Sequence, residues 1–282
     1  MRALGIDVGA SRKGLDLVVL DDRRRPLRVA SRVAVDRLGP LLEEAGADVI
    51  AIDAPPAWAP AGRSRMTERL LAAVNLHAFA TPSAPHGRGV PFYAWMEVGF
   101  EVFAAAEAHG FPRYRAGDPR GTAMEVFPHA SAAVLAGCLP PKGARKKAWR
   151  ERVLRAQGVA TDELTTADRV DAALCALTGL LALSGKRFAP GDPAEGVIVL
   201  PAVSLPARPY RPAPPEASDE GTVPLFRECA CGDPGCAELT RTEFAPGHDA
   251  KRKSMLWTRA REGRDATDEL RRRGWELPPE MR

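Results

Sequence analysis

Acidic side chains stand at the ends of apolar, strand-like segments of this sequence. Asp7 lies at the C-terminal end of the segment 3–9, and Asp53 ends the segment 47–53. A third acid, Glu125, lies in the short strand-like segment 123–127. Carboxylates at such positions are costly to bury without a partner. One cation of high charge density would remove that cost for several of them at once.

A second pair of acids, Asp168 and Asp171, lies in the apolar, helix-like segment 166–183. Their spacing of three residues places both on one face of a helix. Oxygen ligands suit Mg²⁺ or Mn²⁺, and two such ions can clamp an in-line phosphoryl displacement. We therefore expect one carboxylate cluster whose chemistry is metal-dependent phosphodiester hydrolysis, with a catalytic and metal-binding set of Asp7, Asp53, Asp168 and Asp171 and a fifth catalytic candidate in Glu125.

Each acid also has a simpler interpretation. Asp53 precedes Ala-Pro-Pro and could be a turn residue. Asp168 could be an acid favoured near a helix N-terminus by the helix dipole. Two strand-end acids and an i, i+3 pair in one chain favour the cluster over four separate explanations.

Basic residues gather in the helix-like segment 144–157 and just before it. Only Glu151 opposes this run, which fits contact with a phosphate backbone or an ordinary solvated helix face. The run comprises Lys142, Arg145, Lys146, Lys147, Arg150, Arg152 and Arg155.

These residues need a scaffold of strands and helices. An early hairpin argues against a purely parallel sheet, so the order of elements predicts a mixed α/β sheet covered by helices. From hydrophobic periodicity and turn residues we expect strands at 3–9, 15–20, 28–35, 47–53, 123–127 and 196–200, and helices at 36–45, 63–79, 95–108, 130–136, 144–157 and 166–183.

Several of these segments resemble a known superfamily. Gly-Ile-Asp7-Val-Gly, Ile-Asp53-Ala-Pro-Pro and Ala-Asp168-Arg-Val-Asp171-Ala-Ala look like the RNase H-like superfamily, and the Asp-x-x-Asp helix is similar to that of Holliday-junction resolvases of the RuvC type. More specifically, residues 1–201 resemble a predicted-nuclease family catalogued as domain of unknown function four-two-nine, through segments that include Glu125-Val-Phe-Pro and Glu195-Gly-Val-Ile-Val-Leu-Pro.

The resemblance implies an RNase H-like fold, with nuclease activity that is itself an inference from fold for that family. It also implies that the four aspartates are metal ligands. Arg63 and Arg65, on the segment after Asp53, would line the site, with a solvated helix face as the alternative. We expect substrate contacts from Arg63, Arg65, Lys146, Lys147 and Arg150. His129, close to Glu125, is a further candidate.

The chain changes character after residue 201. A proline-rich segment at 202–225 is expected to be a semi-rigid linker, followed by a small module at 226–282. Cys229, Cys231, Cys236 and His248 could form a closed tetrahedral site for structural Zn²⁺, although the spacing differs from paired CxxC motifs. The alternative is reduced, unliganded cysteines. Lys251 to Gly274 is expected to be helical, and the module could also bind a protein partner.

Composition restricts the function less than the motifs do. The 282 residues carry a formal net charge of +4, which permits nucleic acid as a partner without requiring it. No apolar run has the length of a membrane span, and no signal-peptide pattern opens the chain, so we expect a cytoplasmic protein without membrane association.

Metal-dependent cleavage of nucleic acid is therefore the expected function, with two alternatives left open. One is an actin-like or sugar-kinase-like ATP-dependent enzyme, whose first strand also reads Gly-Ile-Asp-x-Gly. The other is a non-catalytic nucleic-acid- or protein-binding module on a nuclease fold.

Overall fold

The chain forms two compact units, Met1–Pro215 and Glu216–Arg282. The computed structural model describes residues 1–9, 13–214, 227–229, 239–240, 248–262 and 266–275. Part of the predicted linker belongs to the first unit: the Leu139 amide donates to the Arg211 carbonyl, and the Ala213 amide donates to the Leu139 carbonyl, both at 2.9 Å. The proline-rich segment thus begins as a strap on the first unit.

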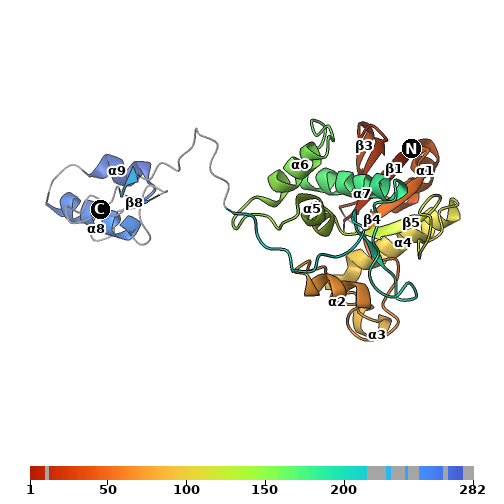
Figure 1. Cartoon of the computed structure of the whole chain (residues 1–282). Helices are drawn as coiled ribbons and strands as arrows, with labels where there is room; N and C mark the ends of the chain where they lie inside the picture. The colour runs from red at the N-terminus through yellow and green to blue at the C-terminus, as the bar shows by residue number, and fades with distance from the viewer. Residues whose placement is uncertain (10–12, 215–226, 230–238, 241–247, 263–265, 276–282) are drawn as a thin grey trace. The chain divides into compact units, whose positions relative to one another are not determined.

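The first unit is built on one mixed sheet, which confirms the predicted α/β class (Figure 1). Its order is β3-β2-β1-β4-β5-β6, in which β3, β2 and β1 are antiparallel and β1, β4, β5 and β6 are parallel. The strands are β1 (Arg2–Val8), β2 (Leu15–Asp21), β3 (Pro26–Val33), β4 (Val49–Asp53), β5 (Ala123–Val126) and β6 (Ile198–Val199).

Helices cover both faces of the sheet, so two hydrophobic clusters form on either side of it. One face packs against α7, behind which lie α5 and α6, and the other packs against α1 and α4. The helices of this unit are α1 (Leu38–Ala45), α2 (Met66–Ala73), α3 (Ala84–Gly87), α4 (Ala94–Ala108), α5 (Pro128–Ala136), α6 (Lys146–Ala156) and α7 (Ala167–Leu183), with short 3-10 turns at Val35–Arg37 and Pro91–Tyr93.

Helix α7 is buried on all sides because it lies between the sheet and two further helices. Every residue from Val170 to Ala182 is buried. Its backbone lies directly on β1 at Gly5, where a Cβ atom would come within 1.9 Å of the Ala172 carbonyl oxygen. Only glycine permits that approach, which brings the second turn of α7 onto the middle of β1.

The helix expected at 63–79 is shorter than predicted, because it runs only from Met66 to Ala73. Asn75 adopts a left-handed conformation with φ of 66°, and the Leu76 amide bonds back to the Leu71 carbonyl at 2.9 Å. The apolar residues beyond it therefore belong to a loop. That loop passes along the site described below.

The second unit contains a short antiparallel pair, β7 (Arg227–Glu228) with β8 (Leu239–Thr240), and two helices, α8 (His248–Arg261) and α9 (Thr267–Arg272). The single helix expected at 251–274 is thus two helices. Leu256, Ala266 and Leu270 are buried between them, and the Arg252 guanidinium pairs with Glu269 at 2.7 Å. In the parts of the chain described, no helix has the length and apolar character that a membrane crossing requires.

Candidate active site

Asp7 and Asp53 are direct neighbours at the C-terminal ends of two parallel strands. They are paired in the register of β1 with β4, so their side chains leave the same face of the sheet. Adjacent strands lie about 4.8 Å apart, which places the two carboxylates side by side. Because Asp7 is two residues beyond Gly5, both point to the face that α7 covers.

Asp168 and Asp171 approach from α7. Ala172 contacts Gly5 in the middle of β1, and Asp168 and Asp171 precede Ala172 on the helix and line the same cavity as Asp7. Helix α7 is capped by the Thr166 hydroxyl, which accepts from the Arg169 amide at 3.2 Å. The strand-end acids and the i, i+3 helical pair therefore lie at the same end of the sheet.

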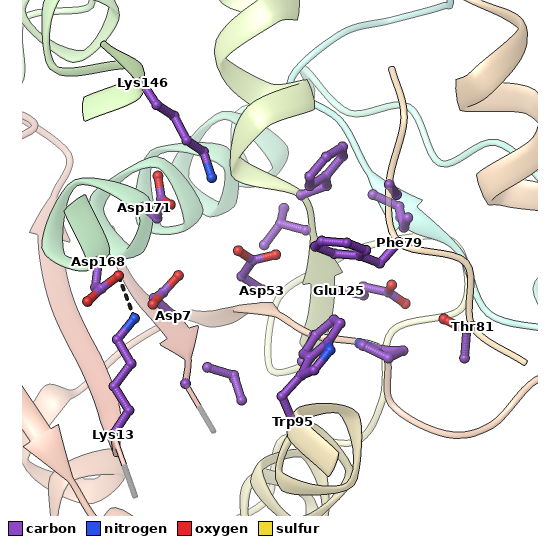
Figure 2. Close-up of a pocket in the computed structure, with 18 of the residues that line it drawn as sticks. Asp7, Lys13, Asp53, Phe79, Thr81, Trp95, Glu125, Lys146, Asp168 and Asp171 are labelled. Atoms are coloured by element: carbon purple, nitrogen blue, oxygen red, sulfur yellow. Dashed lines mark ion pairs between the residues drawn. The ribbon is translucent and has the colours of Figure 1, made fainter. Parts of the chain in front are cut away.

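The four aspartates line one cavity of about 510 Å³ (Figure 2). Figure 2 shows Asp7, Asp168 and Asp171 on one side of Asp53, and the rings of Phe79 and Trp95 on its other side. Glu125, Arg65, Lys146 and Arg150 also contribute to the lining. Most of the residues that the sequence singled out for chemistry thus share this one cavity.

Burial and, after it, the crowding of like charges raise the pKa values of these acids. Burial, together with Asp171 and Asp168, raises the pKa of Asp7 to about 7. Burial and the neighbouring Asp7 raise the pKa of Asp53 well above its ordinary value. Burial also raises the pKa of Asp171, although Arg150 opposes the shift. Lys13 opposes the shift at Asp7, and Arg150 and Lys146 oppose it at Asp53, but these positive charges do not offset burial and the neighbouring acids.

Two basic side chains already neutralise the helical aspartates. Lys13 Nζ lies 2.8 Å from an Asp168 oxygen, and Arg150 Nη1 lies 2.5 Å from both Asp171 oxygens. Arg150 is only 3% exposed, so this ion pair is buried. Asp7 and Asp53, in contrast, have no hydrogen-bond or ion-pair partner among the described residues.

The donor set fits a divalent cation at Asp7 and Asp53 more directly than at Asp168 and Asp171. Two unpartnered carboxylates on adjacent strands are hard oxygen donors of the kind that Mg²⁺ and Mn²⁺ prefer. Within the described ranges, however, no three His, Cys, Asp or Glu side chains already converge as a metal site. Asp168 and Asp171 would contact such a cation only if each carboxylate bound it in addition to its basic partner, Lys13 or Arg150, or if those ion pairs broke.

Glu125 lies on the other face of the sheet. It pairs in register with Ile52, one residue before Asp53, so its side chain leaves the side opposite to the aspartates. Both its oxygens accept from Arg65 at 2.6 Å, and Arg65 Nε donates to Glu68 at 2.9 Å. Arg65 is 1% exposed. Arg65 was expected to contact substrate, but it is buried and holds Glu125 in the cavity wall.

Other predicted residues lie outside the cavity lining. Arg63 is exposed, and Lys147 pairs with Glu151 at 3.1 Å. His129 contacts the rings of Phe127 and Trp149, and burial with Arg150 and Lys146 lowers its pKa to about 4, so it is neutral.

Of the expected zinc ligands, Cys231 and Cys236 lie outside the described residues, Cys229 is half-buried and His248 is the first residue of α8.

Sequence reasoning missed several residues of this site. Asp16 on β2 is paired in register with Asp7, and its carboxylate accepts from the Ser31 hydroxyl at 2.5 Å. An acid inside an apolar strand was the available signal for it. Lys13 and the aromatic residues Phe79 and Trp95 carried no such signal, because they lie in a turn, in a loop and near a helix start.

The fold and the site together define the class of this unit. It is a mixed α/β protein with a carboxylate-lined cavity at the C-terminal ends of its parallel strands. Residues 5–195 match a family described as "Protein of unknown function (DUF429)", and the chain belongs to this family. That match confirms the family indicated by the sequence motifs. A comparison with curated proteins gave no match.

One solved structure that is similar to this chain is described as "Thermus thermophilus RuvC structure". The two share 16% sequence identity with a TM-score of 0.37, over 66% of this chain and 97% of that chain.

Proposed function

We propose that the unit Met1–Pro215 is a divalent-cation-dependent nuclease that hydrolyses phosphodiester bonds of nucleic acid. The observation that supports this most is the neighbouring pair Asp7 and Asp53, which makes no ion pair or hydrogen bond among the described residues yet lines a cavity with two further aspartates. A fold that gathers carboxylates from two strands and a helix fits a cation more simply than it fits four separate structural roles.

In this proposal Asp7 and Asp53 hold the cation, and Asp168 and Asp171 complete its surroundings from α7. Mg²⁺ or Mn²⁺ bound there would polarise a phosphoryl oxygen and lower the pKa of a water nucleophile. Lys146 lines the cavity and makes no hydrogen bond or ion pair within the described part of the chain, so it is available to a phosphate. Glu125 and Arg65 support the wall of the site rather than the cation.

The test is cleavage by the purified full-length chain of a labelled panel: single-stranded, duplex and branched DNA, single-stranded RNA and an RNA–DNA hybrid. We expect cleavage with Mg²⁺ or Mn²⁺ that EDTA abolishes. Asp53→Asn should reduce it by about 100-fold or more, since a neutral amide is a poor cation ligand. The melting temperature of that variant should be unchanged or higher, because one of two adjacent like charges is gone.

Asp162→Asn is the matched control, because Asp162 is exposed and lies outside the cavity lining. It should cleave like the wild type. Metal-dependent cleavage that survives Asp53→Asn would assign the reaction elsewhere and overturn the proposed site. ATP hydrolysis without cleavage would favour the kinase-like alternative, and binding without cleavage of any substrate would favour a non-catalytic nucleic-acid-binding module.

A further inference from the structure

Aromatic side chains form an exposed cluster at the cavity that holds the aspartates. Phe79, Phe92 and Trp95 all line it. The Phe79 ring lies 5.7 Å from that of Phe92 and 6.0 Å from that of Trp95, both in edge-to-face arrangements. Phe79 is 65% exposed and Phe92 57% exposed. Two large apolar rings are thus held open to water beside a charged site.

This exposure calls for an explanation because contiguous exposed apolar surface generally marks a binding site. In an edge-to-face pair one ring presents its edge to the other, so ring faces remain open for a further planar group. Figure 2 shows Phe79 and Trp95 next to Asp53, on the side away from Lys13 and Asp168. A ligand that reaches both the rings and the carboxylates must therefore carry a planar apolar part close to its reacting group.

A nucleotide unit has that composition, with a planar base attached through a sugar to a phosphate. The wall beside the rings also holds a polar atom without a partner: the Thr81 hydroxyl oxygen is buried and makes no hydrogen bond. Bases that stack on protein rings are commonly hydrogen-bonded along their edges as well. The rings and the unpartnered hydroxyl thus suit the face and the edge of a base, and the carboxylate cluster would hold the cation that contacts the phosphate.

The need for an open base face restricts the form of the nucleic acid. A base inside a duplex is already stacked on both faces by its neighbours, so it cannot stack on the exposed rings unless it is extruded. An unpaired or extruded base can, because its faces are free to stack on aromatic side chains.

We propose that Phe79, Phe92 and Trp95 form a stacking platform for an unpaired base next to the scissile phosphate, so that the substrate is single-stranded nucleic acid or an unpaired segment. This inference rests on the proposed nuclease function for the identity of the phosphate at the aspartates. The platform itself is sequence-tolerant, because every base offers a face for stacking.

Binding in EDTA tests the platform without cleavage. Fluorescence anisotropy would compare, for the full-length chain, a labelled single strand, a hairpin duplex and an abasic strand that keeps every phosphate. We expect the wild type to bind the base-bearing strand about tenfold more tightly than the abasic one. Phe79→Leu and Phe92→Leu should remove most of that preference while leaving the abasic strand unaffected. The same measurement on a DNA strand and on an RNA strand of equal sequence identifies which sugar the site prefers.

Leu27→Ala is the matched control, because Leu27 is a similarly exposed apolar residue on β3 outside the cavity. Equal binding of base-bearing and abasic strands by the wild type would overturn the platform, as would equal losses on both strands in the phenylalanine variants. A mononucleotide that competes as well as the strand would overturn the polymeric substrate. A base preference without cleavage would reject the nuclease function alone, and cleavage without a base preference would reject the platform alone.

Discussion

At the scale of single residues, two buried ionic networks border the same cavity and have different consequences. Arg150 with Asp171 lies on the α7 face, and Arg65 with Glu68 and Glu125 lies on the opposite face of the sheet. Breaking a buried pair from one side leaves an uncompensated charge, which destabilises strongly. Arg65 therefore behaves as a structural residue, whereas the unpartnered Asp7 and Asp53 are where a ligand can lower the energy of the site.

His129 on α5 gives a prediction about pH. Its pKa lies at about 4 in the folded chain, because of burial and the nearby Arg150 and Lys146, against 6.5 in the unfolded chain. Between these values the unfolded state binds the proton better, so the stability present above pH 6.5 is lost as the pH falls toward 4. We expect His129→Phe to reduce this loss by about 1–2 kcal/mol, after allowance for solvent screening.

The measurement is the urea unfolding free energy at pH 7.5 and at pH 4.5 for each variant. Phenylalanine keeps a ring against Phe127 and Trp149, so packing should survive the change. His77→Gln serves as the control, since His77 is exposed. If His129→Phe loses as much stability on acidification as the wild type, the titration of His129 has no part in the pH dependence.

At the scale of elements, the sequence predicted the aspartate cluster because its signals are local. Strand-end acids and an i, i+3 pair on a helix can be recognised without knowledge of the sheet. The face on which Glu125 lies could not be predicted, because it depends on the register of β5 against β4, and a shift of one residue reverses the face. The burial of Arg65 depends on the same register, since Glu125 is its partner.

The loop that carries Phe79 was also beyond sequence reasoning. Its apolar residues continue the pattern of α2, so a longer helix was expected at 63–79. The left-handed Asn75 ends that pattern and redirects the chain. Apolar periodicity does not distinguish a ring that packs in a core from one that is exposed at a cavity.

The contact of α7 with β1 gives a prediction at this scale. Gly5→Ala places a methyl group within 1.9 Å of the Ala172 carbonyl oxygen, so α7 must move away from the sheet. We expect a loss of about 2–3 kcal/mol in unfolding free energy. Cleavage should fall as well, because Asp168 and Asp171 move with the helix away from Asp7. Urea unfolding and cleavage rates of the folded variant measure the two effects.

Gly179→Ala is the comparison for that variant, because it lies on the same helix and its added methyl group would meet only side-chain atoms, at 3.0 Å or more. Its strain should be smaller, and the higher helix propensity of alanine offsets part of it. Equal stability of Gly5→Ala and the wild type would show that α7 does not rest on β1 as closely as described.

At the scale of the whole molecule, the two units differ in how much core they contain. The first has a hydrophobic cluster on each face of a six-stranded sheet. In the described part of the second, the core consists of Leu256, Ala266 and Leu270, with Trp257, Ala260 and Trp275 packed around them. Units with so small a core generally need a disulfide, a metal or a partner to fold.

Zinc is the stabiliser that the sequence predicts for this unit, through Cys229, Cys231, Cys236 and His248. We expect the full-length chain to purify with about one zinc per molecule, and Cys231→Ser to lose most of it. Metal analysis with limited proteolysis checks this: loss of zinc should expose the second unit to cleavage while Met1–Pro215 persists as a resistant fragment. Cys138→Ser is the control, because Cys138 belongs to the first unit. A wild-type chain without zinc whose second unit nevertheless resists the protease would show that its small core is stabilised by other means.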